Sequence, residues 1–194
     1  ISLSKNYFMS IENNAIEDNL SKIIFITGGM KSGKSEFAEY LASKITNLTY
    51  IALSDKRQDD VHWEKKILIH RKRRPKNWKL IETTDILTTL NNEIGPILID
   101  SIGGFIMETI EMEEEYWLRQ MKKIITNLKK RKFITIIVGE QVGWSLVSEY
   151  EIGNTYIERI GMLQKEITKI SKNNWVAING RAIKIDEISI EIPT

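Results

Sequence analysis

Cysteine is absent from this sequence of 194 residues. Without a thiol the chain has no disulfide framework, no thiolate metal site and no cysteine nucleophile. No apolar run approaches the length of a membrane-spanning helix. The formal net charge is only +2. Any attraction to nucleic acid or to an anionic surface therefore has to come from a local cluster of cations.

The overall composition is that of a globular protein, with 42% hydrophobic and 28% charged residues. Residues 1–21 are polar and have no sustained apolar period. We therefore predict a loosely held N-terminal extension, followed by a single domain over residues 22–194. Because the start of the chain lacks the basic and apolar regions of a signal peptide, we expect a cytoplasmic protein.

Apolar runs of strand length alternate with amphipathic segments of helical period. The runs predict strands over residues 23–27, 49–53, 78–82, 96–100 and 133–138. Helices are predicted after the first run and over residues 61–69, 85–93, 112–130 and 152–170. Asn179 and Gly180 tolerate positive φ and predict a terminal hairpin between 175–178 and 182–185. The fold class is therefore α/β, a mostly parallel sheet flanked by helices with a C-terminal β-hairpin.

The clearest motif follows the first predicted strand and reads G-x-x-x-x-G-K-S. Its residues are Gly28, Gly29, Met30, Lys31, Ser32, Gly33, Lys34 and Ser35. Glycines let backbone N–H groups turn inward around phosphate oxygens, and the helix N-terminus adds positive potential. Lys34 is predicted to reach the terminal phosphates and the Ser35 hydroxyl to bind Mg²⁺. The alternative is a tight strand-to-helix turn without a ligand.

Asp100 closes the predicted strand over residues 96–100. A carboxylate at the carboxyl end of a parallel strand is well placed to hold Mg²⁺, directly or through water. The competing interpretation is a helix cap, because Asp-Ser also suits the start of a helix.

A basic segment begins at His70 and continues with Arg71, Lys72, Arg73 and Arg74. Three interpretations compete: a solvated surface run, a nucleic-acid contact with Trp63 or Trp78 as stacking partners, and a nucleotide-handling site. In the third, the cations neutralise a triphosphate and His70 is the nucleophile or the general acid and base. Neighbouring cations would lower the pKa of His70 and keep its imidazole neutral.

Several segments together resemble the bifunctional adenosylcobinamide kinase / adenosylcobinamide-phosphate guanylyltransferase family of cobalamin biosynthesis. TYIALSD resembles the Y-I-A-T-S segment of that family, and IHRKRRPKNWKLIE resembles its I-x-x-H-R-x-x-R-P-x-x-W-x-x-x-E block. VGWSLV and WVAINGRAIKI resemble its V-G-x-G-I-V and its closing V-x-L-V-x-x-G-I-x-x-x-I. The resemblance extends from about Ile23 to Ile185.

The resemblance implies a RecA-like P-loop fold, a trimer, and ATP or GTP as substrates with Mg²⁺. It implies phosphorylation of the aminopropanol hydroxyl of adenosylcobinamide, then transfer of GMP from GTP to the new phosphate through a histidine. By the same resemblance His70 carries the GMP, and Ser54 and Asp55 line the pocket. The residues that surround the nucleotide are then Arg71, Lys72, Arg73, Arg74 and Glu82.

The chain also departs from the family pattern. Gly139-Glu140-Gln141 replaces the usual Ser/Thr-Asn-Glu, Ser148 replaces a proline, and Ser-Ile-Gly-Gly follows Asp100 where Cys-Leu-Thr is usual. The R-x-F-R-D block is reduced to residues 154–158, with both arginines lost. These changes indicate either altered acceptor use or ordinary drift at packing positions.

The leading hypothesis is therefore the bifunctional enzyme, with Lys34, Ser35 and Asp100 at the Mg-nucleotide and His70 at the covalent step. The first alternative is a P-loop kinase or nucleotide-binding protein without the guanylyltransferase step. The second is a nucleotide-gated module whose basic segment binds nucleic acid.

Overall fold

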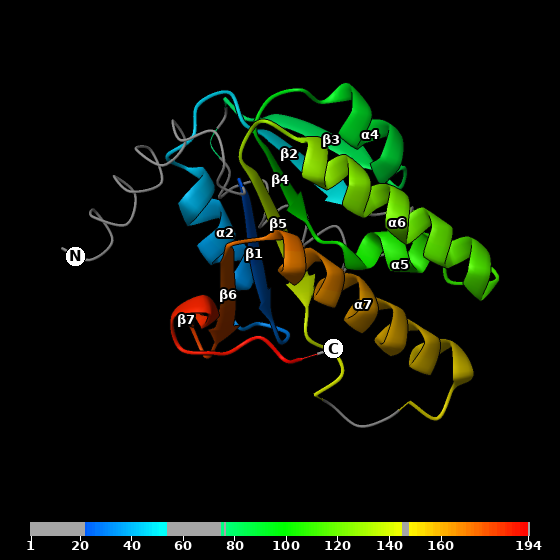
Figure 1. The fold of residues 1–194 in the computed structure, drawn as a ribbon. Coiled ribbons are helices and arrows are strands. Elements are labelled where there is room, and N and C mark those ends of the chain that lie inside the picture. The colour runs from blue at the N-terminus through cyan, green and yellow to red at the C-terminus, as the bar shows by residue number, and fades with distance from the viewer. Residues whose placement is uncertain (1–21, 54–74, 76, 145–147, 194) are drawn as a thin grey trace, which may run out of the picture.

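The computed structural model describes residues 22–53, 75, 77–144 and 148–193. Within these residues seven strands form one sheet in the order β3-β2-β4-β5-β1-β6-β7 (Figure 1). The strands are β1 (Ile23–Gly28), β2 (Thr49–Leu53), β3 (Lys79–Thr83), β4 (Ile97–Asp100), β5 (Thr135–Glu140), β6 (Asn173–Ile178) and β7 (Arg181–Lys184). The helices are α2 (Lys34–Ala42), α4 (Ile86–Asn92), α5 (Gly103–Glu108), α6 (Glu114–Lys130) and α7 (Glu151–Ile170), with a final 3₁₀ turn, η1 (Ile185–Glu187).

Every neighbouring pair of strands is parallel except β6 and β7. The carboxyl ends of β1, β4 and β5 therefore meet at one edge of the sheet. In register, Gly28 lies beside Glu140 and Asp100 lies beside Val138. β5 thus separates the glycine-rich loop from Asp100 and places its own last residue between them.

Alternating side chains of the buried strands serve two apolar layers. Ile24 and Ile26 face the layer under α2, whereas Ile23 and Phe25 face the layer under α6 and α7. Figure 1 shows α2 on one face of the sheet and α4, α5, α6 and α7 on the other. Both layers bury their residues almost fully, which fixes the strands that carry the loop.

The predicted mostly parallel α/β sheet with a C-terminal hairpin is confirmed, with local differences. The strand predicted over 133–138 runs from Thr135 to Glu140, and Phe133 is 45% exposed. The helix predicted over 112–130 begins at Glu114, and the separate helix α5 before it was not predicted. The helix predicted over 61–69 lies outside the described residues, as does the N-terminal extension. None of the helices in the described ranges is both long enough and apolar enough to cross a membrane.

Candidate nucleotide-binding site

The glycine-rich loop leaves β1 at Gly28 and enters α2 at Lys34. A Cβ on Gly28 would lie 2.5 Å from the Ala177 carbonyl oxygen of β6, so the close approach of the two strands requires glycine there. Gly33 adopts φ 95° immediately before the helix, in the left-handed region that favours glycine. The two glycines therefore set the shape of the loop at both ends.

Two neighbouring segments hold this loop in place through backbone hydrogen bonds. Gly180, in the turn between β6 and β7, donates its N–H to the Ser32 carbonyl at 2.9 Å. Gln141, just after β5, donates its N–H to the Gly28 carbonyl at 2.9 Å. The hairpin predicted from Asn179 and Gly180 thus supports the loop, and these residues have the expected positive φ of 49° and 75°.

The loop also presents groups suited to a phosphate. Lys34 folds over it and donates from Nζ to the Gly29 carbonyl at 3.2 Å. The hydroxyl of Ser32 is buried and has no hydrogen-bond partner in the described part of the chain. The first N–H groups of α2 have no acceptor within the helix. Together these groups provide the donors and the positive charge that a phosphate site needs.

Asp100 lies next to this loop, at the end of β4. Ser35 Oγ donates to Asp100 Oδ1 at 3.2 Å, and Tyr50 Oη donates to Asp100 Oδ2 at 2.6 Å. The N-cap position of α5 is occupied by Ile102, so the helix-cap interpretation of Asp100 is wrong. The structure brings together the two residues that the sequence assigned to the metal.

The chemistry of this pair fits Mg²⁺. A hydroxyl and a carboxylate are hard oxygen ligands, and Mg²⁺ is usually held by one or two carboxylates together with waters and substrate phosphates. The described ranges contain no group of three or more acidic or histidine side chains suited to a metal. The remaining ligands of such an ion would be waters and substrate phosphates.

Glu140 is a site residue that the sequence analysis did not select. It ends β5 at the same edge of the sheet, and its carboxylate accepts from the Ser101 hydroxyl and, at 3.2 Å, from the Gly103 N–H. Burial raises the pKa of Glu140, with the nearby Asp100 carboxylate adding to the shift, while the Ser101 hydroxyl and the Lys34 charge oppose it. The sequence signal that could have identified Glu140 is the same as for Asp100, an acidic residue at the end of a buried strand.

Tyr156 of α7 lies close to the Glu140 carboxylate and to Gly103. A Cβ on Gly103 would lie 2.3 Å from Tyr156 Oη and 2.7 Å from Glu140 Oε2. Burial raises the pKa of Tyr156, and the charge of Glu140 adds to the shift. The Tyr156 hydroxyl is therefore neutral near pH 7 and lies against the start of α5.

Gln164 of α7 connects the two central strands. Its Oε1 accepts from Thr27 Oγ1 at 3.0 Å and from Gln141 Nε2 at 3.2 Å, and its Nε2 donates to the Glu140 carbonyl at 2.7 Å. These bonds fix the ends of β1 and β5 relative to each other. The amide of Gln141, where the family pattern has a carboxylate, is thus used in a structural contact.

The other predicted site residues are distributed differently. Met30, in the loop, is 89% exposed. Glu82 lies on β3, the edge strand of the sheet next to β2. The remaining predicted residues lie outside the described ranges: Ser54, Asp55, His70, Arg71, Lys72, Arg73 and Arg74. Their proposed contact with the nucleotide stays a prediction.

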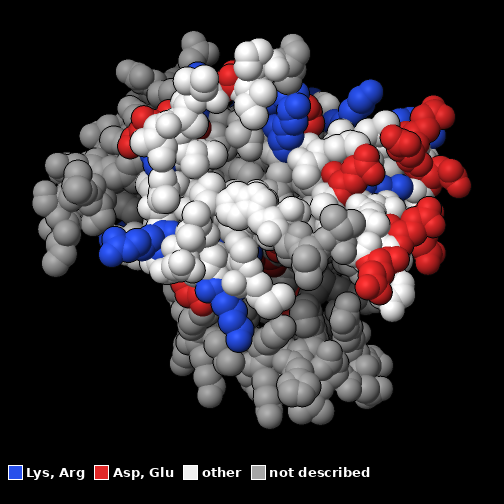
Figure 2. Space-filling view, turned by 90° about the horizontal axis from the view of Figure 1, so that it is seen from below, with Lys and Arg blue, Asp and Glu red and all other residues white. Residues whose placement is uncertain are grey.

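Figure 2 looks onto the carboxyl edge of the sheet. Uncharged side chains occupy the middle of this face, and Asp and Glu side chains gather at the right of the view. In Figure 1 that side carries α5, the start of α6 and the start of α7.

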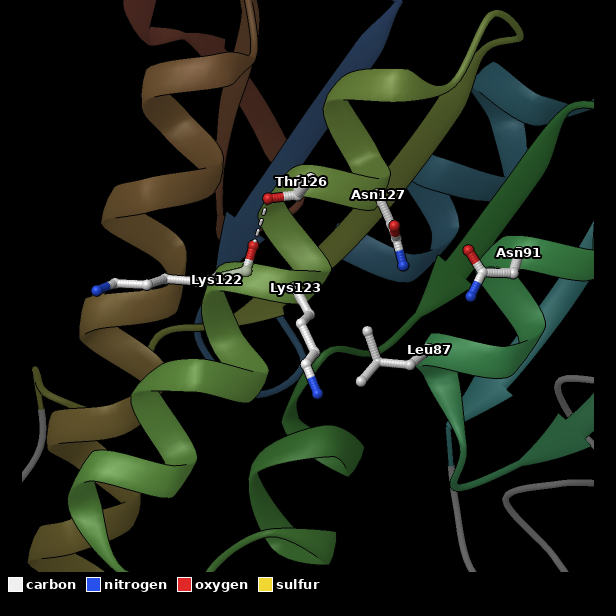
Figure 3. Close-up of a pocket in the computed structure, with 6 residues that line it drawn as sticks. All are labelled: Leu87, Asn91, Lys122, Lys123, Thr126 and Asn127. Carbon is white, nitrogen blue, oxygen red and sulfur yellow. Dashed lines mark hydrogen bonds between the residues drawn. The ribbon is translucent and has the colours of Figure 1, made fainter.

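A groove elsewhere on the molecule is separate from this site. It has a volume of about 490 Å³ and lies between α4 and α6, with Leu87 and Asn91 facing Lys123 and Asn127 (Figure 3). Both of its lysines are exposed, and its Thr126 hydroxyl already donates to the Lys122 carbonyl at 2.8 Å. None of the residues that line it belongs to the phosphate loop.

The mostly parallel sheet, the glycine-rich loop between β1 and α2, and the acid that ends β4 beside Ser35 are the features of the predicted P-loop fold. A solved structure of the flagellar accessory protein FlaH from Methanocaldococcus jannaschii aligns with a TM-score of 0.45 and 12% identity. It covers 89% of this chain and 80% of that one.

Curated relatives resemble the chain over most of its length. The bifunctional adenosylcobalamin biosynthesis protein CobU of Escherichia coli K12 is 23% identical over 181 residues, which cover 84% of this chain and 99% of that protein. Its counterpart CobP of Pseudomonas aeruginosa is 26% identical, over 74% of this chain and 86% of that protein. The family model for cobinamide kinase / cobinamide phosphate guanyltransferase matches residues 24–185. The chain therefore belongs to the cobinamide kinase / cobinamide phosphate guanyltransferase family.

Proposed function

We propose that the protein transfers the γ-phosphoryl group of ATP or GTP to the aminopropanol hydroxyl of adenosylcobinamide, and then adds GMP from a second GTP. The observation that carries this proposal is the contact of Ser35 with Asp100 at a complete phosphate loop, in a member of this family. The two relatives named above are both described as bifunctional, which supports a kinase and a guanylyltransferase in one chain.

The first step requires charge neutralisation and alignment more than covalent chemistry. The substrate hydroxyl attacks the γ-phosphorus and gives up its proton to solvent, the bond to the β,γ-bridging oxygen breaks, and the nucleoside diphosphate leaves. Lys34 would neutralise charge on the β- and γ-phosphates, and Ser35 and Asp100 would hold Mg²⁺ against them. A bound Mg²⁺ would supply Lewis-acid stabilisation of the leaving phosphate oxygens.

The second step is assigned to His70. Its imidazole nitrogen would attack the α-phosphorus of GTP, pyrophosphate would leave, and a phosphate oxygen of the corrinoid would then displace the histidine. Arg71, Lys72, Arg73, Arg74 and Glu82 would surround this nucleotide beside Ser54 and Asp55. The support is the match of the His-Arg-Arg-Pro-Trp-Glu block to the family pattern.

The covalent step can be tested with GTP labelled at the α-phosphate. Incubation with Mg²⁺ should give protein-bound label that is acid-labile and base-stable, as expected for a phosphoramidate. Absence of label in wild type, with nucleotide binding demonstrated in parallel, would rule out the covalent intermediate. Label that persists in His70→Ala would rule out His70 as its carrier.

A kinase without the guanylyltransferase step is the second candidate. The observation in its favour is that the sequence departs from the family pattern over residues 139–158, where both arginines of the R-x-F-R-D block are lost. Formation of labelled adenosylcobinamide-phosphate from γ-labelled nucleotide, without label from α-labelled GTP, would establish this candidate.

A further inference from the structure

Three segments that depart from the family pattern meet at one place in the fold. Ser101 and Gly103 follow Asp100, Glu140 ends β5, and Tyr156 lies in α7. The Glu140 carboxylate binds Ser101 and Gly103, and the Tyr156 hydroxyl occupies the space beside Gly103. These contacts join the three segments into one structural unit.

We propose that Glu140 is a positioning residue of the phosphoryl-transfer site, which holds the turn at residues 100–103 so that Asp100 faces Ser35. The inference rests on the proposed function in one respect, namely that Asp100 and Ser35 serve the Mg-nucleotide.

The hydrogen-bond partners of Glu140 follow directly after Asp100 in the chain. Its two carboxylate oxygens bind the residues one and three positions after Asp100, and so fix the outgoing side of the turn. Asp100 itself is fixed by Ser35 at 3.2 Å and by Tyr50 at 2.6 Å. Without the Glu140 carboxylate the turn would keep the contacts of Asp100 and the bond from the Ile102 N–H to the Val138 carbonyl at 3.0 Å, but residues 101 and 103 would lose their side-chain acceptor. Outer contacts of this kind orient metal ligands.

Close packing makes the turn sensitive to this anchor. Gly103 has no room for a Cβ, because Tyr156 Oη would lie 2.3 Å away. A Cβ on Gly104 would lie 1.9 Å from the Leu53 carbonyl oxygen of β2. The start of α5 is therefore packed between the end of β2 on one side and Tyr156 with Glu140 on the other. A side chain at residue 103 and a hydroxyl at residue 156 should therefore not fit together in this space.

The direct test is Mg²⁺-dependent nucleotide binding, measured by titration calorimetry with a non-hydrolysable nucleotide at several Mg²⁺ concentrations. Glu140→Ala should raise the Mg²⁺ concentration for half-maximal binding by roughly tenfold, the lower end of the range for outer-sphere partners of metal ligands. Glu140→Gln keeps an oxygen for the Gly103 N–H and an amide for Ser101 Oγ, and should stay within about twofold of wild type. Ser101→Ala, which removes one contact, should fall between these values.

Glu158, an exposed glutamate on α7, provides the control, and Glu158→Ala should leave the Mg²⁺ requirement unchanged. An unchanged Mg²⁺ requirement in both Glu140→Ala and Ser101→Ala would overturn the proposal. So would a Glu140→Gln variant as impaired as Glu140→Ala, because that result would assign the role to the charge and not to the hydrogen bonds.

A second measurement tests the coupling of Gly103 to Tyr156 through thermal unfolding. Gly103→Ala should lower the melting temperature, and Tyr156→Phe should restore part of the loss, because it removes the oxygen nearest the added methyl group. Strictly additive effects in the double variant would contradict the proposed unit. Lys34→Ala distinguishes failure of the proposed function from failure of the Glu140 inference. Unchanged nucleotide affinity in this variant would refute the proposed function itself. With weakened affinity in Lys34→Ala, a negative result for the Glu140 variants would refute only the Glu140 inference.

Discussion

The hydroxyl of Ser35 and the carboxylate of Asp100 are 3.2 Å apart, although 65 residues separate them in the chain. The contact forms because β4 and β1 both end at the carboxyl edge of the sheet, with β5 between them. The last residue of β5, Glu140, then binds the turn that follows Asp100. The two side chains proposed to hold Mg²⁺, and the carboxylate that supports one of them, therefore lie where β1, β4 and β5 end side by side.

Asp100→Asn tests the metal assignment. The substitution keeps the shape of the side chain but removes the charged oxygen that Mg²⁺ prefers, so Mg²⁺-dependent nucleotide binding should weaken by about tenfold or more, equivalent to 1.4 kcal/mol. Titration calorimetry with and without Mg²⁺ measures this. Tyr50→Phe, which removes only the hydroxyl bonded to Asp100 Oδ2, serves as the control and should have a smaller effect. Equal Mg²⁺ dependence in Asp100→Asn and wild type would exclude Asp100 as a ligand.

Gly28→Ala tests the close approach of β1 and β6. The added methyl group would meet the Ala177 carbonyl oxygen at 2.5 Å and Ser32 Oγ at 2.6 Å, and the free energy of unfolding should fall by about 1–3 kcal/mol. Gly161→Ala is the matched control, because a Cβ there has no neighbour within 4 Å and the residue lies inside α7. That variant should gain up to about 1 kcal/mol from helix propensity. Denaturant titration of both variants gives the comparison, and a Gly28→Ala variant as stable as wild type would contradict the packing described for the loop.

Arg159 is expected to be the most important cation for stability in the described part of α7. It is buried and donates to the carbonyls of Thr109 at 2.6 Å, Ile110 at 3.0 Å and Met112 at 2.5 Å. Arg159→Met should destabilise the protein by about 2–4 kcal/mol, because these carbonyls lose their donor. The exposed Arg119, paired with Glu115 at 2.6 Å, is the comparison, and Arg119→Met should change stability by less than about 1 kcal/mol. Similar losses in the two variants would show that the three carbonyl contacts contribute little.

Glu140 predicts a definite direction of pH dependence. Burial raises its pKa above the ordinary value of 4.5, so the folded state binds more protons than the unfolded state above that pH. The contribution of Glu140 to stability is therefore full below the unfolded pKa and declines as pH rises through the raised folded pKa. Glu140→Gln removes this titration.

The measurement is the free energy of unfolding of wild type and Glu140→Gln between about pH 4 and about pH 8. The stability of wild type relative to the variant should fall as pH rises. A relative stability that rises with pH would mean that the folded state favours the charged carboxylate.

Local patterns predicted most of the fold. The apolar runs located β1, β2 and β4, and Asn179 with Gly180 located the hairpin. The parallel pairing of β6 with β1 was missed, because a run of strand length does not reveal which strands lie on either side of it. The short helix α5 was also missed, because its Gly103 and Gly104 are poor helix formers that are required by close packing.

The candidate site divides in the same way. The glycine motif and the acid at the end of β4 were enough to predict that Ser35 and Asp100 lie together. The contacts of Glu140 with Ser101 and Gly103 depend on strand order and on the packing of α7, which spacing along the chain does not encode. The single domain over residues 22–194, the trimer and the cytoplasmic location stay predictions.

Transfer of label from γ-labelled ATP or GTP to adenosylcobinamide in the presence of Mg²⁺ is the measurement that tests the central claim most directly. Wild type should form labelled adenosylcobinamide-phosphate, while Lys34→Ala and Asp100→Asn, both shown to be folded, should form far less. Absence of transfer by wild type that binds the Mg-nucleotide, or undiminished transfer by Lys34→Ala, would contradict the assignment of this loop as the phosphoryl-transfer site.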